Sequence, residues 1–187
     1  MEEPLKPRQL SALRGRPGEL CYSSLRERVA EAQQRWIASV FPKMTAVERT
    51  IEKWKREEVA LHSPMEESEV VAKLSALGRP YSRDVLALYA ATGGMEDGYS
   101  DSHMFSLWSL EGVRLETSRY NRPYILFADF LINSHVYCFK YENEERSSVG
   151  VDYFNGDEPE WLAESVEGFF EILNNDAARL KMFDLFG

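Results

Sequence analysis

Apolar residues recur at helical spacing near the beginning of the chain. Over residues 19–40 they fall at steps of three and four, which places them on one face of a predicted helix. This helix is expected to end at Phe41-Pro42, because the residue before a proline disfavours the helical conformation. Thr45 and Glu48 have the spacing of a capping box, so a second amphipathic helix is expected to begin there.

Two shorter helices are predicted next. Ser63 is followed by a proline and, three residues on, by a glutamate, which is typical of a helix start. Gly78 is typical of the residue that ends such a helix. Ser82 is expected to cap a further helix that runs through Ala91 and ends at Thr92-Gly93-Gly94.

The second half of the chain changes to the spacing of strands. Residues 103–108, 124–130 and 135–141 are rich in aromatic and β-branched side chains, the last two on both side-chain parities, as in interior strands. Alternation over residues 149–153 predicts another strand, and an apolar stripe predicts a closing helix from about Ser165. Helices, then adjacent strands, then a closing helix predict an α+β fold with a mainly antiparallel central sheet flanked by helices.

The same pattern divides the 187 residues into three parts. Residues 1–18 contain several prolines and glycines without apolar periodicity, so we expect a flexible tail. Residues 19–62 hold the first two helices as an N-terminal extension, and residues 63–187 form the α+β domain. Within that domain, residues 110–120 remain open between a short helix and a loop.

The composition is that of a soluble globular protein. The longest uninterrupted apolar run, residues 85–91, has seven residues, whereas a membrane-spanning helix needs about 20. The acidic start has no apolar stretch behind it, so no secretory signal is expected. Cys21 and Cys138 are too few and too far apart for a disulfide framework or a zinc site. We therefore expect a cytoplasmic protein that does not bind a membrane.

Charge is concentrated at one end of the chain. The net charge is −9, and residues 142–187 hold 3 Lys and Arg against 12 Asp and Glu. Nucleic-acid binding needs Lys and Arg for the phosphates, so this part of the chain is not expected to bind it. An acidic surface instead favours encounter with a basic protein.

Three segments carry a family resemblance. The first, residues 74–94, contains Leu77-Gly78-Arg79-Pro80-Tyr81 and ends at Thr92-Gly93-Gly94. The others are Phe127-Ala128-Asp129-Phe130-Leu131-Ile132 and the run from Leu162 to Leu173. In this order they resemble the SUKH superfamily, which includes fungal cell-wall-assembly regulators and bacterial toxin-immunity proteins. The resemblance implies a protein-binding domain without catalytic activity, and for bacterial members direct binding to a toxin, often a nuclease or deaminase.

We therefore expect an immunity protein whose acidic segment, residues 142–164, occludes a basic toxin domain. The alternative is a regulatory or scaffold protein of the fungal type. For Asp129 the alternative to partner contact is a hydrogen bond to a loop amide. For Trp161 the alternative is a core position beneath the final helix. The residues expected to bind the partner are Asp129, Glu142, Glu144, Glu145, Asp157, Glu158, Glu160 and Trp161.

Catalytic motifs are not evident in the sequence. The three histidines are isolated, and there is no phosphate-binding glycine loop and no Cys-x-x-Cys motif. Neither catalysis nor a cofactor is therefore expected. One remote alternative is a metal-dependent enzyme with Glu96, Asp97, Asp101 and His103 as ligands, although the intervening glycine and serines are typical of a solvated loop.

Overall fold

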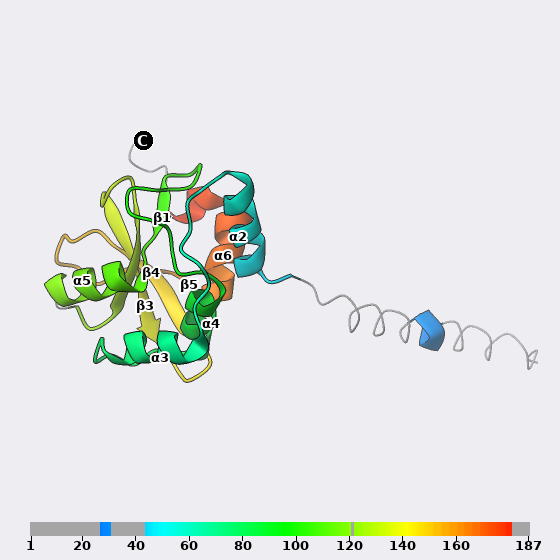
Figure 1. The fold of residues 1–187 in the computed structure, drawn as a ribbon, viewed down its shortest axis with the longest axis horizontal. Coiled ribbons are helices and arrows are strands. Elements are labelled where there is room, and N and C mark those ends of the chain that lie inside the picture. Colours follow the sequence, from blue (N-terminus) through cyan, green and yellow to red (C-terminus); the bar gives the residue numbers. More distant parts are fainter. Residues whose placement is uncertain (1–26, 31–43, 121, 181–187) are drawn as a thin grey trace, which may run out of the picture. The chain divides into compact units, whose positions relative to one another are not determined.

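The computed structural model describes residues 27–30, 44–120 and 122–180 of the chain (Figure 1). Contacts divide the chain into two units, Met1–Lys43 and Met44–Gly187. The second unit holds the sheet and the helices described below.

In the first unit, residues 27–30 are helical, within the helix predicted over residues 19–40. The rest of that helix and the tail predicted over residues 1–18 lie outside the described residues. None of the helices in the described part of the chain is long and apolar enough to cross a bilayer.

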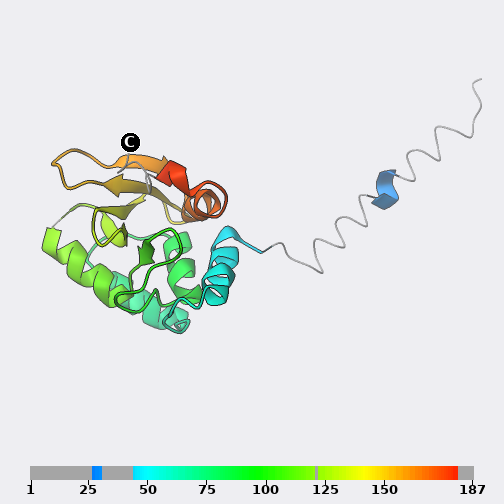
Figure 2. The same cartoon turned by 90° about the horizontal axis from the view of Figure 1, so that it is seen from above.

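Five strands form one sheet in the order β1-β2-β3-β4-β5, and every neighbouring pair is antiparallel (Figures 1 and 2). Together with the surrounding helices, this sheet confirms the α+β fold with an antiparallel central sheet. The last strand was not predicted, because its four residues lie in the acidic segment and lack apolar alternation. The strands are β1 (Phe105–Leu107), β2 (Ile125–Phe130), β3 (His135–Tyr141), β4 (Ser147–Asp152) and β5 (Glu160–Ala163).

The predicted helices of the second unit are present, and residues 110–120 form a helix as well. Ser165 caps the closing helix, since its hydroxyl accepts a hydrogen bond from the Gly168 amide at 3.0 Å. The helices are α2 (Ala46–Arg56), α3 (Glu67–Ser75), α4 (Arg83–Ala91), α5 (Leu110–Tyr120), α6 (Val166–Asn175) and the 3₁₀ helix η1 (Ala177–Leu180).

The predicted start of α3 at Ser63 is wrong, since the helix begins at Glu67. His62 donates its backbone N–H to the carbonyl of Gly94 at 2.9 Å and accepts one from Gly93 at 3.3 Å, which keeps this stretch extended. A Cβ on Gly93 would lie 2.6 Å from that of His62, so a glycine is required where the two segments meet. Pairing between distant segments therefore overrides the local helix signal.

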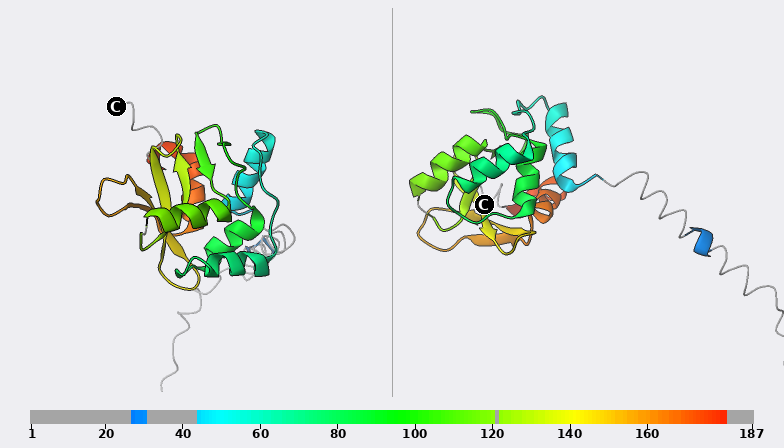
Figure 3. Two further views of the ribbon diagram at one scale, coloured as in Figure 1. Left: turned by 60° about the vertical axis from the view of Figure 1, so that its left-hand side comes forward. Right: turned by 60° about the horizontal axis from the view of Figure 1, so that its bottom comes forward.

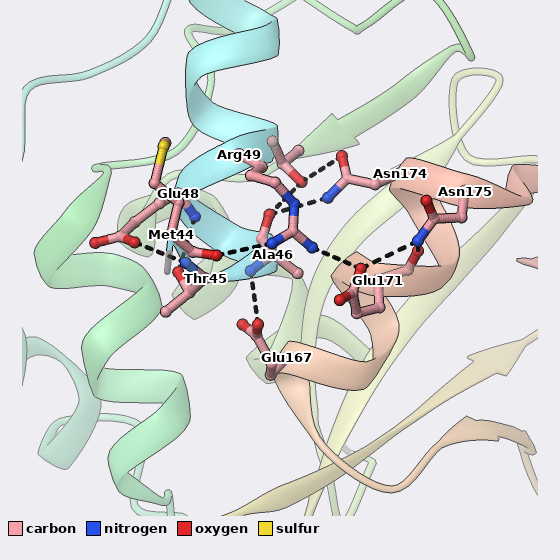
Figure 4. Close-up of polar contacts among 10 residues, drawn as sticks. Met44, Thr45, Ala46, Glu48, Arg49, Glu167, Glu171, Asn174 and Asn175 are labelled. Carbon is pink, nitrogen blue, oxygen red and sulfur yellow. Dashed lines mark hydrogen bonds and ion pairs between the residues drawn. The ribbon is translucent and has the colours of Figure 1, made fainter. Parts of the chain in front are cut away.

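Helices α2 and α6 lie side by side and are joined by polar contacts (Figure 4). The capping box at Thr45 is present, with both reciprocal hydrogen bonds. The Ala46 amide donates to the Glu167 carboxylate at 2.6 Å, and Arg49 forms an ion pair of 2.6 Å with Glu171. The second helix of the expected extension is thus packed within the unit that contains the sheet.

An aromatic core fills the space between the sheet and these helices. Trp54 of α2, which has no exposed surface, lies 6.1 Å from Phe105 of β1 between ring centroids. Phe169 of α6 contacts Phe127 and Tyr137 with centroid distances of 5.8 Å and 5.2 Å. Trp54 is therefore a core residue.

Asp84, in the first turn of α4, connects three elements. Its carboxylate accepts hydrogen bonds from the Ser147 amide at the start of β4 (3.2 Å) and the Val166 amide at the start of α6 (3.1 Å). The Ser82 hydroxyl donates to the same carboxylate at 2.5 Å. One side chain thus satisfies polar groups at the beginnings of α4, β4 and α6.

A smaller apolar cluster occupies the other face of the sheet, which we call the second face. Leu126, Val136 and Cys138 are fully buried there, and the aromatic side chains of Trp108 and Phe154 pack against them. The cover on this face therefore includes aromatic side chains from loops.

Candidate functional site

The acidic segment 142–164 does not form one surface. Tyr141 pairs with Ser147 at one end of β3 and β4, and Val136 pairs with Asp152 at the other end. The β3–β4 turn and the β4–β5 loop consequently leave the sheet at opposite ends, as Figure 3 shows in its left panel. The expected partner-binding carboxylates are divided between them.

At the β3–β4 turn the carboxylates are interspersed with cations. Glu142 lies 3.3 Å from Lys140, and Glu145 lies 3.4 Å from Arg83. The turn is also attached to α4, since the Arg83 amide donates to the carbonyl of Glu144 at 2.8 Å. Much of the negative charge here is therefore neutralised within the fold.

At the β4–β5 loop, Asp157 and Glu158 are exposed. Asp157 accepts a hydrogen bond from the side-chain amide of Asn155 at 2.8 Å, which stabilises the turn. Glu160, at the beginning of β5, is exposed as well. Asp157 and Glu158 lie on this loop, whereas Glu160 adjoins Trp161, whose ring centroid is 5.1 Å from the Lys140 ammonium.

Trp161 lies across Gly150 on the second face, opposite Tyr124. A Cβ on Gly150 would be only 2.7 Å from the indole ring, so glycine is needed beneath it. The Lys140 ammonium lies 5.1 Å from the ring centroid, within the range of a cation–π contact. Trp161 is 39% exposed, so it is a half-covered surface residue.

Asp129 is 6% exposed and holds the β2–β3 turn. Its carboxylate accepts from the Asn133 amide at 2.6 Å and from the Trp108 indole N–H at 2.8 Å. Burial raises the pKa of this carboxyl, and the two hydrogen bonds counteract that shift. The hydrogen bond to a loop amide is thus present, and little of the side chain is open to direct partner contact.

Asp101 has a parallel role in the loop before β1. It is 4% exposed, and its carboxylate accepts from the amides of His103 and Phe105 at 2.8 Å and 3.0 Å and from the Trp54 indole at 3.1 Å. Glu96 and Asp97 are exposed on the loop surface. Among the described residues, no group of three or more His, Cys, Asp or Glu side chains is arranged to hold a metal ion.

A cavity of about 380 Å³ opens beside Asp129. The loop over residues 95–100 forms one wall, and Trp108 and Asp129 contribute to its lining. Three large apolar side chains at this cavity are exposed: Tyr99 (47%), Met104 (42%) and Ile132 (88%). We call this the Ile132 pocket; its carboxylates Glu96, Asp97 and Asp129 were named from the sequence, but its exposed apolar side chains were not.

The backbone at the Ile132 pocket is strained. Met104 has a φ of 63°, and Leu131, Ile132 and Asn133 have φ values of 48°, 54° and 64°, all in the left-handed region. The Leu131 amide donates to the Met104 carbonyl at 3.1 Å, so the two strained loops support each other. A β-branched residue in this conformation is rare, and such strain is concentrated at functional sites.

Other titratable groups near this end of the sheet are enclosed. His135 is 1% exposed, and burial lowers its pKa to about 4. Its ring Nε2 lies 3.1 Å from the hydroxyl of Tyr137, which donates to the Leu180 carbonyl at 2.8 Å. The Cys138 thiol is fully buried, and burial raises its pKa far above the usual range. Neither group is presented to solvent.

A comparison with family models found no match, and a comparison with curated proteins found none either. The resemblance to the SUKH superfamily therefore stays a prediction.

Proposed function

We propose that this chain is a non-enzymatic, cytoplasmic protein-binding domain of the SUKH type, an immunity protein that binds a basic toxin domain directly. The observation that carries the proposal is the Ile132 pocket, where exposed apolar side chains adjoin carboxylates. Contiguous exposed apolar surface on a soluble domain is typical of a protein interaction site. The adjoining negative charge favours a basic partner.

Several titratable side chains of the described residues are occupied or enclosed. Asp101 and Asp129 have their carboxylates occupied by amide and indole donors. His135 and Cys138 are enclosed. These side chains stabilise loops and the sheet, and they leave the exposed surface to recognition.

The test is capture of partners from a lysate of the source cells on the tagged full-length chain, followed by reconstitution of the complex. We expect one basic polypeptide in equimolar amount, released by high salt because ionic screening weakens charge complementarity. The purified polypeptide should be toxic when expressed alone and harmless when co-expressed with this chain. Recovery of several housekeeping enzymes instead would favour a regulatory protein of the fungal type.

A further inference from the structure

We propose that the Ile132 pocket takes an arginine flanked by apolar residues from the protein partner. This inference rests on the proposed function and deepens it by naming the surface and the chemistry of the segment it binds. The pocket volume of about 380 Å³ lies within the range of roughly 300–1,000 Å³ that is usual for ligand pockets.

Ile132 occupies a position that is unfavourable for folding alone. Its side chain is 88% exposed at the tip of a hairpin turn, where folding gains little from an apolar residue. Its φ of 54° adds a backbone cost that glycine or asparagine would avoid. Both the exposure and the backbone conformation of Ile132 are unfavourable for folding, and contact with a partner would explain why isoleucine is found there.

The loops that form the Ile132 pocket are rigid. The two loops that present Met104 and Ile132 are each tied to a buried aspartate, Asp101 and Asp129 respectively. Each aspartate also accepts from a tryptophan indole, which anchors it to the packed part of the domain. The apolar side chains are therefore held in place before binding, which lowers the entropy lost on association.

The Ile132 pocket carries negative charge that no described cation pairs with. Glu96 and Asp97 contribute exposed carboxylates to the pocket, and no Lys, Arg or His is among its described lining residues. Glu96 and Asp97 form no ion pair with any described residue, in contrast to Glu142 and Glu145 at the opposite end. An incoming cation would be attracted without displacing an internal partner.

The side chains that line the Ile132 pocket favour arginine over lysine. The pocket combines carboxylates with the aromatic side chains of Tyr99 and Trp108. A guanidinium binds carboxylates in a bidentate manner and stacks on aromatic faces, and it is more weakly hydrated than an ammonium. Apolar residues beside the arginine would contact Met104 and Ile132.

The experiment is selection of a random twelve-residue peptide library, displayed on phage, against the full-length chain. We expect enrichment of peptides with arginine next to Leu, Phe or Trp, whose affinity is then measured by fluorescence anisotropy. Arginine-to-lysine exchange in a selected peptide should weaken binding at least fivefold. Selection that enriches no peptide, or peptides without arginine, would overturn the proposal.

Variants of the chain locate the binding surface. E96Q/D97Q should lower the affinity for a selected peptide at least tenfold. The matched control E144Q/E145Q at the β3–β4 turn should change that affinity less than twofold. I132N should weaken binding at least fivefold while raising the melting temperature, so loss of folding cannot explain its effect. Equal weakening by the two double variants would contradict the pocket assignment.

The same variants separate this inference from the proposed function. If a basic polypeptide from the lysate binds E96Q/D97Q as tightly as the unmodified chain, the protein-binding function stands and the pocket assignment fails. If no basic polypeptide is recovered on the unmodified chain, the proposed function fails.

Discussion

The two ends of the sheet use aspartates in different ways. At the end that contains the β3–β4 turn, Asp84 satisfies the amides of Ser147 and Val166 and joins three elements. At the other end, Asp101 and Asp129 each accept from a tryptophan indole and stabilise a loop whose backbone is strained and whose tip is apolar and exposed. The same carboxylate–amide chemistry therefore supports the fold in one place and a presented surface in the other.

Surface charge differs between the two ends as well. Glu142 and Glu145 have cations within 4 Å, whereas Glu96 and Asp97 have none among the described residues. A paired carboxylate loses an interaction when a partner arrives, but an unpaired one does not. Negative net charge alone is thus a poor guide to where a basic partner binds.

The largest expected effect is at Asp84. D84A leaves the Ser147 and Val166 amides without their acceptor, and we expect it to lower the free energy of unfolding by about 4 kcal/mol. The matched variant D129A leaves the Asn133 amide and the Trp108 indole without their acceptor but joins fewer elements, and it should cost about 2 kcal/mol. Urea denaturation followed by circular dichroism measures both. Equal losses would contradict the contrast between the two ends.

Acid should weaken the pocket end through His135. Its pKa is about 4 in the folded state and about 6.5 when unfolded, so the unfolded chain binds the proton first as pH falls. The neutral His135 ring contributes about 3 kcal/mol to the free energy of unfolding. This contribution is fully present above pH 6.5 and is lost as the pH falls through 4.

H135Q keeps a hydrogen-bond donor near Tyr137 and removes the titration. The difference in unfolding free energy between the unmodified chain and H135Q should therefore change with pH between 7 and 4. Taking this difference cancels the contribution of Asp129, whose raised pKa acts in the opposite direction. A difference that is flat with pH would show that His135 is not buried in the neutral form.

Relief of backbone strain should stabilise the protein. I132N places a residue that tolerates the left-handed conformation at the hairpin tip, and we expect a gain of about 1 kcal/mol. L115N is the control, because Leu115 is also exposed but lies in α5 with helical backbone. It should destabilise slightly, since asparagine is a poorer helix former than leucine. A loss of stability in I132N would refute the strain argument.

The smallest effect is expected at the exposed ion pairs of the β3–β4 turn. E145A and E164A remove contacts of 3.4 Å to Arg83 and 3.5 Å to Arg146, all between well-exposed side chains. Each should change stability by less than about 0.5 kcal/mol, as solvent screens such pairs. Thermal unfolding in low and high salt is the measurement, and a loss near 2 kcal/mol would show that this turn depends on its charges.

Local patterns predicted the elements whose signals are complete within a few residues. The capping box at Thr45 and the stripe of α6 after Ser165 are confirmed because each depends on contacts at helical spacing. The start of α3 was misplaced because pairing of His62 with Gly94 is a long-range event. β5 was missed since its four residues, which begin with an exposed Glu160, lack apolar alternation at a sheet edge.

The candidate site was less predictable than the fold. Strand register decides which turns share an end of the sheet. The sequence alone therefore did not show that the carboxylates of the acidic segment lie at two different ends. A partial signal existed in Asp129, a carboxylate at the end of an apolar strand. The strain at Ile132 carries no such signal, because isoleucine is not a turn residue.

The α2–α6 contact has a consequence for synthesis of the protein. Ala46 and Glu167 are 121 residues apart in sequence, so α2 leaves the ribosome long before its partner exists. At about 5–20 residues per second, translation of the intervening chain takes roughly 6–24 seconds. During that time the native surface for the apolar face of α2 is incomplete, because Trp54 packs on Phe170 of α6 as well as on Phe105 of β1. The nascent chain therefore depends on chaperones or on its own solubility until α6 emerges and completes the domain.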